Sequence, residues 1–274
     1  MTLKDSHVLV TGGSSGIGLA IAKQCAAGGA RVSLVSRDMR NLAAARAAIL
    51  AGQPTAKVEV AAADVSIEAE ILSAISTVQS ANGPVDILVT SAGVATPGHF
   101  GDMPSAVFER SMSVNYLGTV YPVRAVLPGM RQRRSGAIVM ISSGAGLIGL
   151  FGYTAYAPTK FAVRGLAESL RGELKGTGVQ VSVVYPPDTD TPQLAEENLT
   201  KPAETKPITA GAGLWSADDV ARLTLEGVAC GHFAITPGAQ LTALYWLQGL
   251  LSPMLQWRFD GIAARVRRDR GSAV

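Results

Sequence analysis

A tyrosine and a lysine four residues apart, with a serine thirteen residues before the tyrosine, form a set that could transfer protons. They are Tyr156, Lys160 and Ser143. On a helix, positions i and i+4 share one face, so the Lys160 ammonium can lie beside the Tyr156 phenol. A free phenol titrates near about 10, and a neighbouring cation lowers its pKa by favouring the phenolate. The set suits general acid–base chemistry at a carbonyl or alcohol, although the same spacing also arises by chance on helix surfaces.

The surrounding sequence places this pair at the start of a helix. Pro158 lies two residues after Tyr156, and proline is tolerated in the first turn of a helix but breaks its interior. We therefore expect the helix to begin at or just before Tyr156 and to run to about Lys175. The apolar run 137–141 predicts a strand, so that Ser143 follows a strand end.

A glycine-rich turn near the N-terminus predicts a nucleotide-binding site. An apolar, β-branched strand over 7–11 is followed by G-G-S-S-G-I-G and by a periodic helix over 17–27. The helix N-terminus presents unpaired N–H groups and positive dipole, and glycines let phosphate oxygens approach the backbone. Glycine turns are common, but one that opens a βαβ unit is typical of dinucleotide binding. The candidate residues are Thr11, Gly12, Ser14, Ser15, Gly16, Ile17 and Gly18.

The end of the second expected strand, 31–35, indicates which cofactor binds. Enzymes that use NAD place an acid there to bind the ribose 2′-hydroxyl, and an acid would repel a 2′-phosphate. Here Ser36 takes that place and Arg37 follows it. A guanidinium can bind phosphate through two hydrogen bonds, so we expect NADPH/NADP+, with Arg40 as a second candidate. The alternative is that Arg37 only caps a solvated loop.

Alternation of strands and helices along the chain predicts an α/β fold. Six or seven such alternations favour a single domain with a Rossmann-type, doubly wound parallel sheet and helices on both faces. Ligands of such sheets bind beyond the carboxyl ends of the strands. The expected strands are 7–11, 31–35, 57–62, 86–89, 137–141, 179–185 and 232–236. Further cofactor candidates at these ends are Asp64, Val65, Ala92, Gly93 and Pro186.

Two polar residues have two interpretations each. Asp64 can accept a hydrogen bond from an adenine amino group or cap the helix that follows, and the two roles are compatible. Asn115 falls in a long helical and apolar stretch, where a buried amide must bond to backbone or water. Its amide either takes part in the active site or only satisfies backbone groups left unbonded in the helix, and these two interpretations overlap.

Composition narrows the classes of partner. Of 274 residues, 47% are hydrophobic, and the formal net charge is only +3. No Lys/Arg-rich block is interleaved with aromatics, which argues against nucleic acid. The three histidines are scattered and predict no metal site. Cys25 and Cys230 fall in expected helices, where buried reduced thiols are the default, and no signal-peptide run is present, so we expect a cytoplasmic protein.

Two segments lack a clear place in the sheet. The stretch 188–214 has no clear period and is rich in Pro, Thr, Glu and Lys, so we expect an irregular substrate lid within a catalytic domain of residues 1–240. The extension 241–274 is apolar and then arginine-rich, and Pro253 interrupts it too early to span a bilayer. We expect 241–270 either to make peripheral contact with the inner face of a membrane or to pack on the pocket or a partner subunit.

With these residues assembled, the chain resembles the short-chain dehydrogenase/reductase family over nearly its whole length. The resemblance rests on T-G-G-S-S-G-I-G at 11–18, Asp64, A-G at 92–93, Asn115, Ser143, Tyr156 and Lys160, in family order and spacing. The chain departs from the family at Thr90-Ser91, where asparagine is usual. This departure concerns hydrogen bonding between strands more than the chemistry.

The family resemblance implies hydride transfer from NADPH to a ketone carbon, with Tyr156 protonating the oxygen and Ser143 hydrogen-bonding to it. It implies that Lys160 lowers the Tyr156 pKa and binds the nicotinamide ribose, and that Asn115 holds a water for reprotonation. It also implies a homodimer or homotetramer. Two threonines match the family position that contacts the nicotinamide carboxamide, Thr189 and Thr191.

Within this family, the segments 115–122, 149–160 and 185–205 resemble 3-ketodihydrosphingosine reductases, of an anchorless bacterial type. The resemblance implies a lipid-like ketone substrate from sphingolipid biosynthesis. The ammonium of that substrate would prefer an acid, for which Asp188, Asp190, Glu196 and Glu197 are candidates, although a solvated charge run is the alternative. Two other functions compete: a generic ketone, 3-ketoacyl or steroid reductase, and a nucleotide-binding regulator without activity. The intact set of Asn115, Ser143, Tyr156 and Lys160 argues against the regulator.

Overall fold

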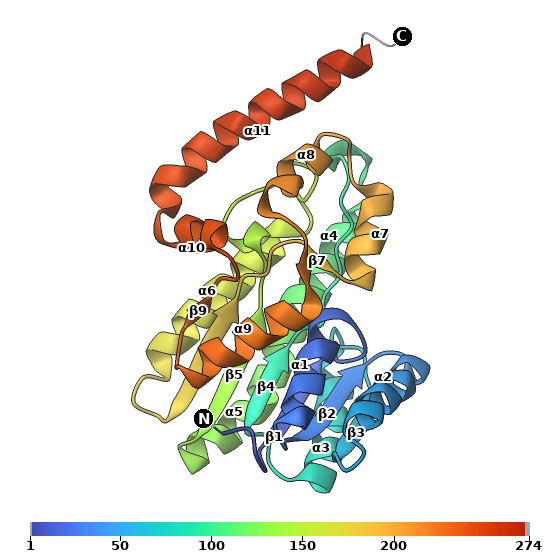
Figure 1. Cartoon of the computed structure of the whole chain (residues 1–274), viewed down its shortest axis with the longest axis vertical. Helices are drawn as coiled ribbons and strands as arrows, with labels where there is room; N and C mark the ends of the chain where they lie inside the picture. The colour runs from blue at the N-terminus through green and yellow to red at the C-terminus, as the bar shows by residue number, and fades with distance from the viewer. Residues whose placement is uncertain (1, 272–274) are drawn as a thin grey trace.

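The computed structural model describes residues 2–271, and within them seven parallel strands form one central sheet in the order β3-β2-β1-β4-β5-β6-β9 (Figure 1). From β3 the chain returns to the far side of β1, so the connections diverge between β1 and β4. This divergence opens a crevice at the carboxyl ends of those two strands. The strands are β1 (His7–Thr11), β2 (Arg31–Ser36), β3 (Val58–Ala62), β4 (Ile87–Thr90), β5 (Gly136–Ile141), β6 (Val179–Val184) and β9 (Ala234–Ile235). The α/β fold with a doubly wound parallel sheet is confirmed.

Helices cover both faces of the sheet and create two apolar cores. Successive side chains of a strand point to opposite faces, so Val8 and Val10 enter one core while Leu9 enters the other. Helices α1 (Gly16–Ala27), α2 (Met39–Gly52) and α9 (Ala217–Ala229) pack on the first face. The opposite face is covered by α3 (Glu68–Asn82), α5 (Gly118–Arg133) and α6 (Ala157–Glu173). Shorter helical segments are η1 (Phe100–Asp102), α4 (Ser105–Met112), η2 (Ser113–Leu117), η3 (Gly144–Gly146) and η4 (Ala210–Ala212).

The two cysteines do not share one environment. Cys25 of α1 is buried in the core, and burial raises the pKa of its thiol to about 12. The expectation that Cys230 is also buried in a helix is wrong. Helix α9 ends at Ala229, and Cys230 follows it as an exposed residue.

The lid contains regular structure, which corrects the expectation of an irregular segment. It holds β7 (Thr189–Asp190), α7 (Pro192–Thr200), α8 (Thr205–Thr209) and β8 (Trp215–Ser216). Helix α7 begins where it does because the Thr191 hydroxyl accepts a hydrogen bond from the Leu194 N–H at 3.2 Å and Pro192 occupies the first turn. Strands β7 and β8 pair in parallel and join the two ends of the lid.

The C-terminal extension forms α10 (Ala239–Trp246) and α11 (Gln248–Gly271), and α11 extends across the molecule beyond α8 (Figure 1). Leu241 and Leu244 of α10 pack in the core. Near its far end, α11 returns to the lid, where Arg267 lies 3.7 Å from Glu204 and over the Phe151 ring. Residues 272–274 of the expected extension and the Arg270 side chain lie outside the described part. In the part described, no helix has the length and apolarity needed to cross a bilayer.

Candidate active site

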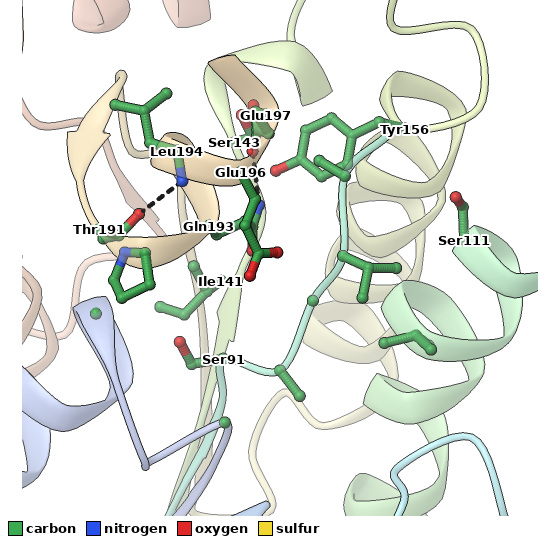
Figure 2. A pocket seen from close by; sticks show the side chains of 18 of the residues that line it. Ser91, Ser111, Ile141, Ser143, Tyr156, Thr191, Gln193, Leu194, Glu196 and Glu197 are labelled. Carbon is green, nitrogen blue, oxygen red and sulfur yellow. Dashed lines mark hydrogen bonds between the residues drawn. The ribbon is translucent and has the colours of Figure 1, made fainter. Parts of the chain in front are cut away.

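A pocket of about 940 Å³ lies at the carboxyl ends of the strands, between the sheet edge and the lid. One end is lined by Ser36 and Arg37 after β2, and the other by Ser143 and Tyr156 after β5. Figure 2 shows the second end, where the Tyr156 hydroxyl points toward Ser143 and toward the lid helix α7. The pocket is elongated, with separate groups of residues at its two ends.

The proton-transfer set comes together as its spacing predicts. Helix α6 begins at Ala157 with Tyr156 as its N-cap, so the expected effect of Pro158 on the helix start is confirmed. The Lys160 Nζ lies 5.5 Å from the centroid of the Tyr156 ring and donates a hydrogen bond to the Ile141 carbonyl oxygen at 3.0 Å. Ser143 caps the turn after β5 by accepting from the Ala145 N–H at 3.1 Å. The serine hydroxyl is thereby held facing the tyrosine.

Burial decides the protonation of this set. Desolvation, followed by the negative charge of Glu197, raises the pKa of Tyr156, whereas hydrogen bonds to Ser143 and Gln193 lower it. The net direction is opposite to the expected lowering by Lys160, because the phenol is only 8% exposed. Desolvation lowers the pKa of Lys160 to about 8. At neutral pH the site therefore holds a neutral phenol, which still carries the proton it can donate, beside a cationic lysine.

Asn115 connects three parts of the site. It lies in η2, one turn of π-helix between α4 and α5, and is 1% exposed. Its Oδ1 accepts from the Val94 N–H at 2.8 Å, and its Nδ2 donates to the Val94 carbonyl at 3.0 Å and to the Thr159 hydroxyl at 2.9 Å. This amide ties the loop after β4 to α6, which carries Lys160. Asn115 does not line the pocket, and its part in holding a water stays a prediction.

Two glycines of the turn, Gly12 and Gly18, have no room for a Cβ atom. Gly12 has φ +68°, and a Cβ on it would lie 2.6 Å from the Ala92 nitrogen. A Cβ on Gly18 would overlap the Gly12 carbonyl oxygen. Helix α1 has no side-chain cap and no acid in its first turn, which leaves its free N–H groups to the pocket. Ser14, Ser15, Gly16 and Ile17 line the pocket with Gly12, whereas Thr11 is buried beneath it.

The end of β2 presents a hydroxyl and a guanidinium. The Ser36 Oγ is buried and has no hydrogen-bond partner among the described residues. Arg37 is exposed and lines the pocket, and within residues 2–271 it makes no ion pair. The structure does not place Arg40 in the pocket wall, contrary to expectation. Its guanidinium is held 3.1 Å from Asp38, whose carboxylate also caps the α2 N-terminus.

Asp64 lines the same end and organises the turn before α3. Its Oδ1 accepts from the Ser66 N–H at 2.9 Å and from the Ser66 hydroxyl at 2.6 Å. Desolvation alone would raise the Asp64 pKa, but the Ser66 bonds together with Arg37 and Arg110 lower it below its usual value. The expectation that Asp64 caps α3 is wrong: the N-cap of α3 is Ile67, which has no side-chain cap, and Asp64 bonds instead to Ser66 in the preceding turn. The carboxylate borders the pocket beside Val65, and its bond to an adenine amino group stays a prediction.

Backbone and lid form the other end. Ala92, Gly93 and Pro186 line the pocket, and a Cβ on Gly93 would lie 3.7 Å from the Lys160 Nζ. Thr189 and Thr191 also line it, but their hydroxyls bond to local backbone: Thr189 Oγ1 donates to the Pro187 carbonyl and Thr191 Oγ1 to the Thr189 carbonyl.

Three residues near the tyrosine form a cluster that motif spacing did not single out as a unit. Tyr153 donates to Glu197 Oε2 at 2.7 Å, and Gln193 Nε2 donates to Glu197 Oε1 at 2.9 Å. The Tyr153 and Tyr156 rings lie 5.7 Å apart. Gln193 and Glu197 are one helical turn apart on α7, a spacing that would have paired them had a helix been expected there. The cluster places the buried Glu197 carboxylate at the Tyr156 end of the pocket.

The four acids of the lid are not equivalent. Glu197 is 7% exposed, whereas Asp190 and Glu196 are exposed. Asp188 lies 3.5 Å from the buried Lys201 ammonium. The expectation of a solvated charge run thus holds for Asp190 and Glu196 and is wrong for Glu197.

Residues 2–271 contain no group of three or more His, Cys, Asp or Glu arranged to hold a metal ion. His7 instead bonds to the Gly83 carbonyl at 2.7 Å and the Ser33 hydroxyl at 2.8 Å, and desolvation lowers its pKa. Its ring joins β1 to β2 and to the end of α3.

The pocket residues fit a nicotinamide dinucleotide. The Gly12 turn and the uncapped α1 suit a diphosphate, since backbone N–H groups and helix dipole favour negative charge there. The unpartnered Ser36 hydroxyl borders the ribose end, and Tyr156 with Lys160 borders the opposite end. The volume of about 940 Å³ falls at the upper end of the range for cofactor and small-molecule sites.

Comparison with known proteins gives consistent matches. A family described as short chain dehydrogenase matches residues 6–202. The 3-dehydrosphinganine reductase of Danio rerio is 44% identical over 257 residues, which are 93% of this chain and 77% of that protein. The 3-ketodihydrosphingosine reductase of Bos taurus is 44% identical over 242 residues, covering 87% of this chain and 73% of that protein.

Solved structures share the fold. Levodione reductase superposes with a TM-score of 0.78 at 28% identity, covering 88% of this chain and 99% of that chain. A short chain dehydrogenase/reductase from Burkholderia phymatum in complex with NAD gives a TM-score of 0.80 at 26% identity, covering 89% of this chain and 93% of that chain.

Proposed function

This chain belongs to the short-chain dehydrogenase/reductase family, and we propose that it reduces the keto group of 3-ketodihydrosphingosine to dihydrosphingosine with NADPH. It is an oxidoreductase of the nicotinamide dinucleotide-dependent kind. The named activity of the Danio rerio and Bos taurus relatives supports the substrate. The observation that carries the chemistry is the neutral, buried Tyr156 phenol beside Ser143 and Lys160 at one end of the pocket.

In the proposed reaction, the bound cofactor supplies a hydride, with its electron pair, to the keto carbon. Tyr156 donates its proton to the keto oxygen as negative charge develops there, and the alcohol results. The Ser143 hydroxyl is held by its own turn to donate a hydrogen bond to the same oxygen. Lys160 stabilises the phenolate that remains, and Asn115 holds the loop and helix that position Lys160.

Initial rates with three ketones test the substrate. NADPH oxidation is measured with 3-ketodihydrosphingosine, a 3-ketoacyl thioester and a steroid ketone. We expect the largest kcat/KM with 3-ketodihydrosphingosine. A larger value with the thioester or the steroid would replace this proposal by the generic reductase, and no turnover of any ketone would favour a nucleotide-binding regulator.

The preference for NADPH rests on Arg37. Its guanidinium borders the pocket beside the unpartnered Ser36 hydroxyl and is not consumed by an ion pair within residues 2–271. No acid takes the position that would repel a 2′-phosphate. Arg40 makes a weaker case because Asp38 holds it outside the pocket wall.

The surface of α10 and α11 supports contact with a membrane. Trp246, Leu250, Met254 and Trp257 are 76%, 72%, 67% and 80% exposed. The last three are spaced to lie on one face of α11, and Trp246 ends α10 just before it. Five arginines and two aspartates follow between positions 258 and 270. Exposed tryptophans with adjacent arginines suit the interface of an anionic bilayer, and the proposed substrate is itself a lipid.

Vesicle flotation with surface variants tests this contact. Truncation before α10 would also remove Leu241 and Leu244 from the core, so replacing the four exposed apolar side chains by serine is the cleaner change. We expect wild-type protein to float with anionic vesicles and the serine variant to remain at the bottom. If neither floats and the variant instead loses a dimer or tetramer in light scattering, the surface joins subunits.

A further inference from the structure

The Glu197 carboxylate is buried in the pocket and makes no direct ion pair within residues 2–271, although its charge acts on nearby Lys160 and raises the pKa of that ammonium against desolvation. Glu197 is 7% exposed and lines the pocket wall. Its two hydrogen-bond partners among the described residues are neutral, the Tyr153 hydroxyl at 2.7 Å and the Gln193 amide at 2.9 Å. Within residues 2–271, no lysine or arginine nitrogen lies within 4.0 Å of it. Burying a carboxylate this way is costly, so the arrangement favours a cation that arrives from the pocket.

The reacting end of the pocket surrounds this carboxylate. Tyr153, which bonds to Glu197, lies with its ring 5.7 Å from that of Tyr156. Gln193 bonds to Glu197, and the same side chain lies near enough to the Tyr156 hydroxyl to lower the pKa of that phenol. Figure 2 shows Glu197, Gln193 and Ser143 gathered on the side toward which the Tyr156 hydroxyl points. A cation bound at Glu197 therefore lies close to the oxygen that Tyr156 protonates.

An α-amino ketone has a cation close to its keto oxygen, as this site has Glu197 close to Tyr156. Its ammonium is attached to the carbon next to the keto carbon, so cation and keto oxygen must be bound side by side. We propose that Glu197 binds the substrate ammonium and selects α-amino ketones over ketones without the amine. This inference rests on the proposed function and identifies the residue that gives it its specificity.

The other acids of the lid are less suitable. Asp188 is already paired with Lys201, whose ammonium is 3.5 Å away. Asp190 and Glu196 are exposed, where water screens a charge and weakens an ion pair. Glu197 alone among these four is both buried and without a direct ion pair in the part of the chain described.

Binding of the ammonium has a second effect on Tyr156. The Glu197 charge opposes ionisation of the phenol, because two negative charges would then lie close together. A substrate ammonium at Glu197 offsets this repulsion and makes the phenol a better acid. The substrate amine therefore raises kcat as well as affinity. With glutamine in place of Glu197, the amine should bring neither gain.

Paired substrates and three lid variants test the assignment. Wild type, Glu197→Gln and Glu196→Gln are assayed with 3-ketodihydrosphingosine and with the same ketone lacking the amino group, and Asp190→Asn serves as an exposed control. Glutamine keeps the shape and an acceptor for the Tyr153 hydroxyl. We expect Glu197→Gln to lower kcat/KM for the amino ketone by about 10- to 100-fold, the range of a charge-assisted hydrogen bond. The value for the deaminated ketone should not fall, because loss of the Glu197 charge removes an opposition to ionisation of Tyr156. NADPH binding should not change.

The outcomes separate the two proposals. A wild-type enzyme that prefers the amine, with that preference intact in Glu197→Gln or lost only in Glu196→Gln, overturns the role of Glu197 and leaves the proposed function standing. A fall with both ketones in Glu197→Gln indicates a structural role and also overturns it. A wild-type enzyme that reduces only the deaminated ketone overturns both.

Discussion

The two ends of the pocket differ in whether backbone or side chains form the wall. At the cofactor end, the wall is mostly backbone: the Gly12 turn, the first turn of α1 and the loop at Gly93. At the substrate end, the wall is side chains, and several of them, Gln193 and Glu197 among them, come from the lid. At Gly12 and Gly18 the backbone wall leaves no room for a Cβ, whereas the side-chain wall can be altered residue by residue on one short helix. The substrate end is therefore the part of the pocket that substitution can change without disturbing the backbone.

Removal of one oxygen atom at the substrate end gives the largest expected effect. Tyr156→Phe deletes the proton donor, and we expect kcat to fall by about 10²- to 10⁴-fold while the NADPH Kd stays within a few fold of wild type. Tyr153→Phe is the matched control, since it removes a neighbouring hydroxyl that bonds only to Glu197 in the described structure. Its loss should be much smaller. Steady-state rates and fluorescence titration measure the two quantities, and turnover retained in Tyr156→Phe would exclude the assigned acid.

Addition of one carbon atom at the cofactor end acts on stability. Gly12→Ala introduces a side chain at φ +68°, with its Cβ 2.6 Å from the Ala92 nitrogen. We expect the free energy of unfolding in urea to fall by about 2–4 kcal/mol, together with loss of NADPH binding. Gly101→Ala is the control, because a Cβ there meets no atom within 4 Å. Equal stability of the two variants would contradict a rigid backbone wall.

Arg37 is the side-chain exception at the cofactor end. Arg37→Ala should raise the KM for NADPH by about tenfold or more and leave the KM for NADH nearly unchanged, because only NADPH carries the 2′-phosphate. Arg40→Ala should change neither, since its partner is Asp38. A larger change in Arg40→Ala than in Arg37→Ala would reverse the assignment.

Lys160 lies where the two ends meet and gives the smallest effect, on pH dependence. Burial lowers its pKa to about 8, so the ammonium is present below that pH and is lost as pH rises through it. The ammonium stabilises the phenolate left by proton transfer, so kcat for reduction should fall by about half from pH 7 to pH 8 and further above. Lys160→Met should be slow and show no such inflection. A wild-type profile flat to pH 10 would contradict this role.

Sequence reasoning succeeded where local chemistry decides the outcome. The glycine turn, Pro158 and the apolar strands dictate their own conformations, so the sheet and the start of α6 could be predicted, and most of the expected cofactor-site residues line the pocket. Sequence reasoning did not reveal which side chains are already paired or covered. Asp38, only two residues before Arg40, pairs with the Arg40 guanidinium, and Arg40 does not line the pocket. Burial reverses the direction of the Tyr156 pKa, and no spacing reveals how deeply a phenol is covered.

The lid illustrates the same limit. Its polar composition indicated an irregular segment, but the cap at Thr191 and the pairing of β7 with β8 order it. Tyr153 and Glu197 are 44 residues apart, so no local sequence pattern predicts their hydrogen bond. Only the folded lid brings the buried acid to the tyrosine.

The two-residue pairing of β7 with β8 also bears on how the lid holds its side chains. Thr189 pairs with Trp215 and Asp190 with Ser216, so the departing and returning chains are fastened at one place. Helices α7 and α8 lie between these fastened ends, and α7 carries both Gln193 and Glu197. Because one short strand pair anchors the start and the end of this segment, a substitution that disrupts the pair would displace the amide and the acid from Tyr156 together.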